Sequence, residues 1–181
     1  MNYQTIAEIY QANAKIREKL KTVISNLTDE QTNARLDENG WTISQIVEHI
    51  SIVEKGMATI CSRLLQKSTE ANIPNDGTAY ISQEFLERAG SIADRRTHKA
   101  QAPDMVLPSG NLSIKESLAK MEDNSKILEQ VRTGLETVDT QKLKFPHPFF
   151  GDLSATEWFA LIGGHEIRHI DQIEEILSTL R

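Results

Sequence analysis

The spacing of hydrophobic side chains along the chain predicts four long helices. In residues 5–27, isoleucine, leucine and valine recur at intervals of three, four and seven, as on the buried face of an amphipathic helix. The same period runs through residues 42–67, 113–138 and 154–180, and a weaker helical pattern covers residues 78–96. No alternating pattern of useful length predicts a strand. The pattern therefore predicts an all-α protein.

Three of the predicted helices begin at a capping box, in which a hydroxyl side chain accepts a backbone N–H and a side chain three residues later reaches back. These boxes begin at Thr42, Ser113 and Ser154. Turn-forming residues gather at 72–77 and 102–110, inside the long link between the second and third helices. Four amphipathic helices with such a link predict an up-down four-helix bundle with one long crossover between helices 2 and 3.

Length, composition and charge exclude several kinds of protein and of binding site. A length of 181 residues, with 39% hydrophobic and 25% charged residues, predicts a single globular domain over residues 1–181. The single cysteine, Cys61, excludes an intrachain disulfide and a Cys-rich zinc site. The net charge of −6 argues against a nucleic-acid partner. Charges interrupt the apolar runs, so we expect no signal peptide, no membrane span and a cytoplasmic location.

Two histidines, His165 and His169, lie one helical turn apart in the fourth predicted helix. Their spacing places both rings on one face, about 6 Å apart along the axis. On a helical wheel His169 lies about 40°, and His165 about 80°, from the centre of the apolar stripe. Glu166 lies about 20° from that centre, where a carboxylate is costly to bury without a partner. The two histidines and the inward glutamate together indicate a metal site. The alternative is that both histidines are only packed in the core.

A third ligand must come from upstream. The His165–His169 segment fits the H-E-x-x-H pattern of zinc metalloproteases, but no histidine or cysteine follows it to supply their third ligand. His49, on the flank of the second predicted helix, is the best candidate. His147 precedes the fourth helix and can reach the mouth of the bundle. His98 lies among charged residues, so we expect it in solvent.

Two segments resemble motifs of the DinB/YfiT-like family of metalloenzymes. One is WTISQIVEH, which ends at His49; the other begins with HPFFGDLSATEW at His147 and continues into an HxxxHxxQ pattern that ends at Gln172. The resemblance implies a four-helix bundle with the crossover between helices 2 and 3. It also implies a divalent metal, zinc or nickel, bound by a histidine triad consisting of His49, His165 and His169.

The resemblance further implies a metal-dependent enzyme that acts on a small molecule. Some relatives transfer thiols such as bacillithiol, mycothiol or glutathione, and hydrolysis is the second reaction expected. A non-catalytic metal- or ligand-binding bundle in stress response is the alternative, and a degenerate relative with core histidines is a third hypothesis. A homodimer is also expected, because helical bundles with apolar flanks often associate.

Three further side chains receive predicted roles. Glu166 is predicted to be a catalytic base or to orient a ligand, with a buried ion pair as the alternative. Gln172 is predicted to bind substrate, with a hydrogen bond to an imidazole N–H as the alternative. His147 is predicted to bind substrate.

Overall fold

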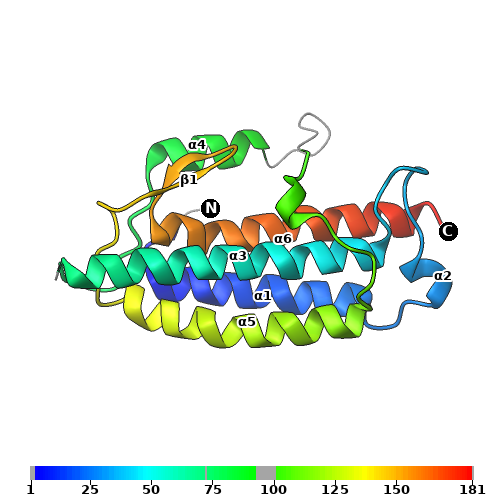
Figure 1. Ribbon diagram of the computed structural model, residues 1–181, viewed down its shortest axis with the longest axis horizontal. Helices are drawn as coiled ribbons and strands as arrows, with labels where there is room; N and C mark the ends of the chain where they lie inside the picture. The colour runs from blue at the N-terminus through cyan, green and yellow to red at the C-terminus, as the bar shows by residue number, and fades with distance from the viewer. Residues whose placement is uncertain (1–2, 72, 93–100, 181) are drawn as a thin grey trace.

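Four long helices form the body of the protein in the computed structural model, which describes residues 3–71, 73–92 and 101–180 (Figure 1). They are α1 (Ile6–Ile24), α3 (Ile43–Glu70), α5 (Ile114–Leu135) and α6 (Ala155–Ser178). The shorter elements are α2 (Asp29–Thr32), α4 (Gln83–Ile92), the 3-10 helix η1 (Asp104–Val106), β1 (Phe145–His147) and β2 (Gly151–Leu153). The four long predicted helices and the all-α class are confirmed, with each end of these four displaced by less than one turn. The weaker predicted helix over 78–96 corresponds to α4, which begins five residues later, and the predicted end lies outside the described residues.

Local capping chemistry determines where the helices begin. The side chains of Thr42, Ser113 and Ser154 each accept the backbone N–H three residues later, and the third residue returns a bond to the cap backbone. All three predicted boxes are therefore confirmed. Thr5 and Thr28 form two more boxes, at the starts of α1 and α2. Because each box satisfies two otherwise unpaired N–H groups, it stabilises one starting residue over its neighbours.

The helices do not alternate strictly in direction. The helices α1 and α6 run one way and α3 and α5 run the other way, and each long helix packs against two of the others (Figure 1). Since α3 and α5 are parallel, the chain between them must return over the whole length of the bundle. That return is the predicted long crossover, and it contains α4 and η1. The crossover is confirmed, whereas the up-down order is wrong at this one step.

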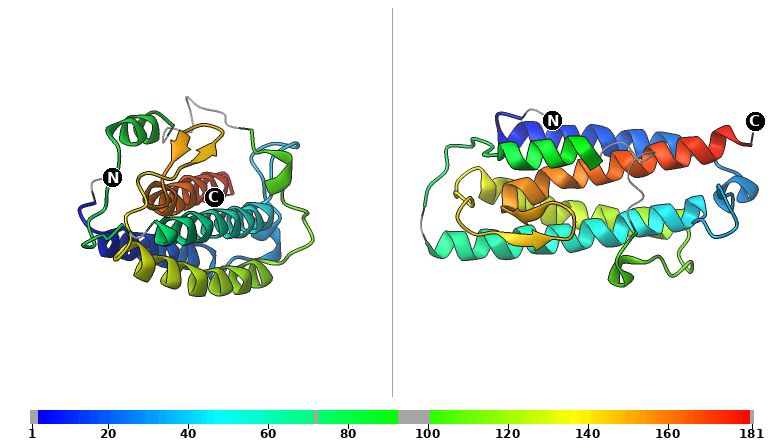
Figure 2. Two further views of the ribbon diagram at one scale, coloured as in Figure 1. Left: turned by 60° about the vertical axis from the view of Figure 1, so that its left-hand side comes forward. Right: turned by 90° about the horizontal axis from the view of Figure 1, so that it is seen from above.

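A small antiparallel hairpin precedes α6. Strands β1 and β2 pair with Phe145 opposite Leu153 and His147 opposite Gly151, and Gly151 has a φ of 73°. The indole N–H of Trp158 donates to the carbonyl of Phe145, which holds the hairpin over the start of α6 (Figure 2). The hairpin was not predicted from the sequence, because strands of three residues are too short to show a hydrophobic period.

The core is divided by a polar layer. One apolar cluster includes Ile9 and Phe159, and the other includes Leu20 and Ile173. Cys61 is fully buried in the first cluster. Charged and amide side chains lie between the clusters: Arg17, Glu54, Asn124 and Glu166. Among the described residues, no helix has the length and apolar character needed to cross a bilayer.

Candidate metal centre

Three histidines converge between α3 and α6. The Nε2 atoms of His49 and His165 lie 3.2 Å apart, and one ring nitrogen from each of His49, His165 and His169 lies within 4.8 Å of the others. The structure thus brings together the three side chains that the sequence singled out from two distant segments. Of the other two histidines, His147 lies in β1 and His98 lies outside the described residues.

His49 is held in one tautomer by the crossover. It lies in the second turn of α3 and is 4% exposed. Its Nδ1 is 2.8 Å from the carbonyl oxygen of Val106 in η1. Because a carbonyl oxygen can only accept, Nδ1 carries the proton and the lone pair of the neutral ring is on Nε2. The ring of Trp41 packs against the imidazole with the centroids 4.7 Å apart.

His169 is oriented by a residue of its own helix. Its Nδ1 donates to Oε1 of Gln172 at 2.9 Å, one turn further along α6. The proton on Nδ1 again leaves the lone pair on Nε2. The amide oxygen of Gln172 therefore orients a candidate ligand, which is the alternative that the sequence left open, and its predicted contact with substrate stays a prediction.

The surroundings of His49 and His165 lower the pKa of both rings and so favour their neutral forms. Burial lowers the pKa of His49. Burial also lowers the pKa of His165 well below its ordinary value, and the neighbouring His169 and His49 lower it further. Neutral imidazoles offer the lone pairs that a metal ion requires, without protons that must first be displaced.

The donor set fits zinc or nickel. Imidazole nitrogens suit both ions, and bonds of about 2.0–2.1 Å in a tetrahedral zinc site place two nitrogens about 3.3 Å apart. The 3.2 Å between Nε2 of His49 and Nε2 of His165 matches that separation. The three ring nitrogens, all within 4.8 Å of one another, are close enough to bind one divalent cation between them.

Glu166 faces the core and forms an ion pair. Its two oxygens accept from Nε and Nη2 of Arg17 at 2.7 and 2.9 Å, and its side chain is 2% exposed. Arg17 also contacts Glu54, which accepts from Asn124 at 3.0 Å. This is the ion-pair alternative for Glu166, and the guanidinium occupies both oxygens that a catalytic base would use. The position of Arg17, three residues before Leu20 on the same helix face, was the signal that sequence reasoning overlooked.

His147 is a neutral hydrogen-bond donor that packs on the face of α6 that also carries His165. Its Nδ1 accepts the backbone N–H groups of Phe149 and Phe150 at 3.1 and 3.3 Å, and burial lowers its pKa to about 4. The proton of the ring is therefore on Nε2, which bonds no acceptor in the described part of the chain. The ring packs on Trp158, 5.0 Å between centroids. Trp158 shares a helix face with His165, seven residues or about 10 Å further along α6.

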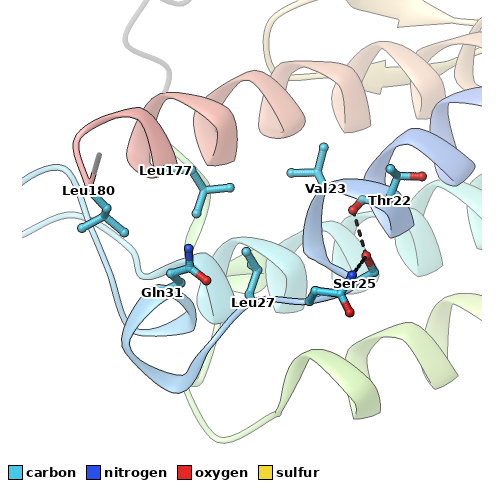
Figure 3. A pocket seen from close by; sticks show the side chains of 8 residues that line it. Thr22, Val23, Ser25, Leu27, Gln31, Leu177 and Leu180 are labelled. Atoms are coloured by element: carbon cyan, nitrogen blue, oxygen red, sulfur yellow. Dashed lines mark hydrogen bonds between the residues drawn. The ribbon is translucent and has the colours of Figure 1, made fainter.

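A separate cleft of 270 Å³ lies between the C-terminal ends of α1 and α6 and α2. Its apolar side chains include Val23, Leu27, Leu177 and Leu180 (Figure 3). Its polar lining consists of hydroxyl and amide side chains, and none of the residues that line it is a histidine, cysteine, aspartate or glutamate. The cleft therefore offers no donor set for a metal ion.

Comparison with known proteins places the chain in a family. A family model of the DinB superfamily matches residues 12–173. The chain belongs to the DinB superfamily. It is similar to the uncharacterized protein YuaE of Bacillus subtilis (strain 168), with 26% identity over 159 residues, 87% of this chain and 90% of YuaE.

Two solved structures confirm the DinB-type fold. The four-helix bundle protein TT2238 superposes with a TM-score of 0.63 and 21% identity, over 94% of this chain and 99% of TT2238. YfiT from Bacillus subtilis superposes with a TM-score of 0.61 and 19% identity, over 97% of this chain and 87% of YfiT. YfiT is described as a probable metal-dependent hydrolase with an unusual four-helix bundle topology.

Proposed function

We propose that this DinB-superfamily protein binds one divalent ion, zinc or nickel, and is a metal-dependent enzyme that acts on a small molecule. The ligands are His49, His165 and His169. The observation that carries the proposal is the convergence of their ring nitrogens, with the proton of His49 and of His169 held away on Nδ1. The description of YfiT as a probable metal-dependent hydrolase supports the same class of function.

A divalent ion bound by three neutral imidazoles would keep its full +2 charge and a coordination position for a further ligand. It would act as a Lewis acid that favours an anionic oxygen or sulfur ligand. The chain supplies the positioning. The carbonyl of Val106 holds His49, and the amide of Gln172 holds His169. These outer contacts fix which nitrogen of each ring faces the centre.

Two reactions suit this centre. Hydrolysis of an ester or amide needs an oxygen nucleophile, and S-transfer needs the sulfur of a thiol of the bacillithiol or glutathione type. We place hydrolysis first because YfiT is described as a probable hydrolase. Thiol S-transfer remains the second candidate, supported by the resemblance to thiol-transferring relatives.

His147 is the residue that we assign to the substrate. Its Nε2–H is a fixed donor, since Nδ1 accepts two backbone N–H groups and the low pKa keeps the ring neutral at pH 7. A donor of this kind binds a carbonyl or carboxylate oxygen. Glu166 has no assigned catalytic role in this proposal, because both of its oxygens accept from Arg17.

The first experiment measures metal binding. Purified protein is stripped with a chelator, titrated with Zn²⁺ and Ni²⁺, and analysed for stoichiometry and affinity. We expect one ion per chain, and a loss of at least about 100-fold in affinity for His169→Ala, because two imidazoles seldom hold an ion in competition with water. His147→Asn is the matched control and keeps the affinity. Equal affinity of His169→Ala and the unaltered protein would contradict the proposed site.

The second experiment measures turnover. The zinc- and nickel-loaded proteins are presented with ester and amide panels, and with low-molecular-weight thiols plus an electrophile panel. Activity that is lost in His169→Ala, and that shows a raised KM in His147→Asn, supports the proposal. One tightly bound ion per chain without turnover on either panel would favour the non-catalytic binding module.

The homodimer stays a prediction, which analytical ultracentrifugation tests.

A further inference from the structure

A buried carboxylate lies beside a candidate metal ligand, and its hydrogen-bond partners are neutral N–H and hydroxyl groups. Glu48 directly precedes His49 in α3 and is 2% exposed. Its Oε1 accepts the backbone N–H and the hydroxyl of Ser109 at 3.0 and 2.7 Å, and its Oε2 accepts the N–H of Gly110 at 2.9 Å. No lysine or arginine of the described ranges forms an ion pair with it.

The loop that Glu48 holds is shaped for this contact. We call residues 106–112, the end of the crossover, the strap. Gly110 has a φ of 76°, a conformation that favours glycine, and a Cβ atom there would lie 3.2 Å from Nε2 of Gln45. This turn directs two successive N–H groups, those of Ser109 and Gly110, at one carboxylate.

Polar contacts hold the strap on α3, because apolar burial contributes little at this place. Leu107 is 45% exposed, and Met105, just before the strap, is 87% exposed. The contacts to α3 are the three bonds to Glu48, the bond from His49 to the carbonyl of Val106, and a bond from the hydroxyl of Ser44 to the strap at 3.1 Å.

We propose that Glu48 is a positioning residue for the metal centre. By holding Ser109 and Gly110, it places the carbonyl of Val106 against Nδ1 of His49, which keeps the lone pair of that ring on Nε2. The inference rests on the proposed metal function. It has a reciprocal consequence: docking of the strap strengthens metal binding, and metal binding stabilises the docked strap to the same extent.

The test compares three substitutions by their zinc affinity. Glu48→Gln replaces one acceptor with an N–H₂ group that faces backbone N–H donors, so we expect zinc binding to weaken by about 10–100-fold. Ser109→Ala removes only the hydroxyl bond and has a smaller effect. Ser62→Ala is the matched control. It removes a hydroxyl bond within α3, to the carbonyl of Ala58, which does not involve the strap, and changes the affinity by less than about threefold.

Hydrogen exchange and imidazole ¹⁵N shifts separate positioning from a general loss of stability. In the metal-free protein, we expect His49 to carry its proton on Nδ1, and Glu48→Gln to lose that preference. Zinc should slow exchange of the amides of Ser109 and Gly110 in the unaltered protein and not in Glu48→Gln. If Glu48→Gln lowers only the melting temperature and leaves the His49 tautomer and the zinc affinity unchanged, the carboxylate is structural and the inference is wrong.

The failure of this inference differs from the failure of the proposed function. If the unaltered protein binds no zinc or nickel, the proposed function fails, and with it the metal-positioning role. If the unaltered protein binds zinc tightly and Glu48→Gln binds it equally well, only the role of Glu48 fails.

Discussion

Two polar clusters of the bundle have opposite chemistry: one lies between α3 and α6, and the other takes side chains from all four long helices. In the histidine cluster, Nε2 of His49 and Nε2 of His165 lie 3.2 Å apart, and Nδ1 of His49 donates to the carbonyl of Val106. In the ion-pair cluster, Arg17 bonds both Glu54 and Glu166, and Asn124 bonds Glu54. The first cluster consists of imidazoles and is bonded to the crossover through Val106, whereas the second consists of charged and amide side chains, of which Glu54, Asn124 and Glu166 are buried.

The difference distinguishes a candidate binding site from a polar cluster that only stabilises the fold. His165 and Glu166 are consecutive, but successive helical residues point about 100° apart, so one ring faces α3 and the next carboxylate faces α1. A cluster in which every donor meets an acceptor is complete as it stands. The histidine cluster instead brings three ring nitrogens within 4.8 Å of one another, which is a donor set that can bind a cation.

The largest expected effect comes from breaking the ion-pair cluster. Arg17→Met leaves Glu54 and Glu166 buried without their cation, so the free energy of unfolding should fall by about 3–5 kcal/mol. Arg132→Met is the matched control, because Arg132 also pairs with two carboxylates but on the surface of α5. It should cost at most about 1 kcal/mol. Urea unfolding measures both, and equal losses would show that burial of the network is not the cause.

An intermediate effect is expected from the histidine cluster. Gln172→Leu removes the acceptor for Nδ1 of His169 and should weaken zinc binding by about 10–100-fold, with a small change in the stability of the metal-free protein. Gln172→Glu keeps an acceptor at the same place and should retain the affinity. Isothermal titration with Zn²⁺ measures both variants. Equal weakening by the two substitutions would contradict an orienting role.

The smallest effect concerns pH. Burial lowers the pKa of His147 to about 4, below its ordinary value near 6.5. Between those values the unfolded chain binds the proton and the folded protein does not, so the free energy of unfolding falls as the pH falls from about 6.5 toward 4. His147→Asn cannot titrate and should lose this part of the slope. Unfolding curves at pH 7, 6 and 5 measure the difference, and identical slopes would contradict the low pKa.

Prediction from sequence succeeded where the signal is local. The boxes at Thr42, Ser113 and Ser154 set the helix starts, because each uses a hydroxyl and a side chain only three residues away. The three histidines of the cluster were predicted to act together because their order along the chain resembles that of a known family. The helical wheel alone did not distinguish metal ligands from histidines packed in the core. Inward-facing Glu166 was recognised, but its partner was not, since Arg17 lies 149 positions earlier.

The sequence by itself determined four amphipathic helices, the capped starts and the residue types that can bind a metal. Only the tertiary structure decided which groups meet: Arg17 with Glu166, Val106 with His49, and Glu48 with the strap. The physical reason is range. Hydrophobic period and capping act within a few residues, whereas a hydrogen bond that closes across the bundle depends on the stagger and direction of helices, which packing sets.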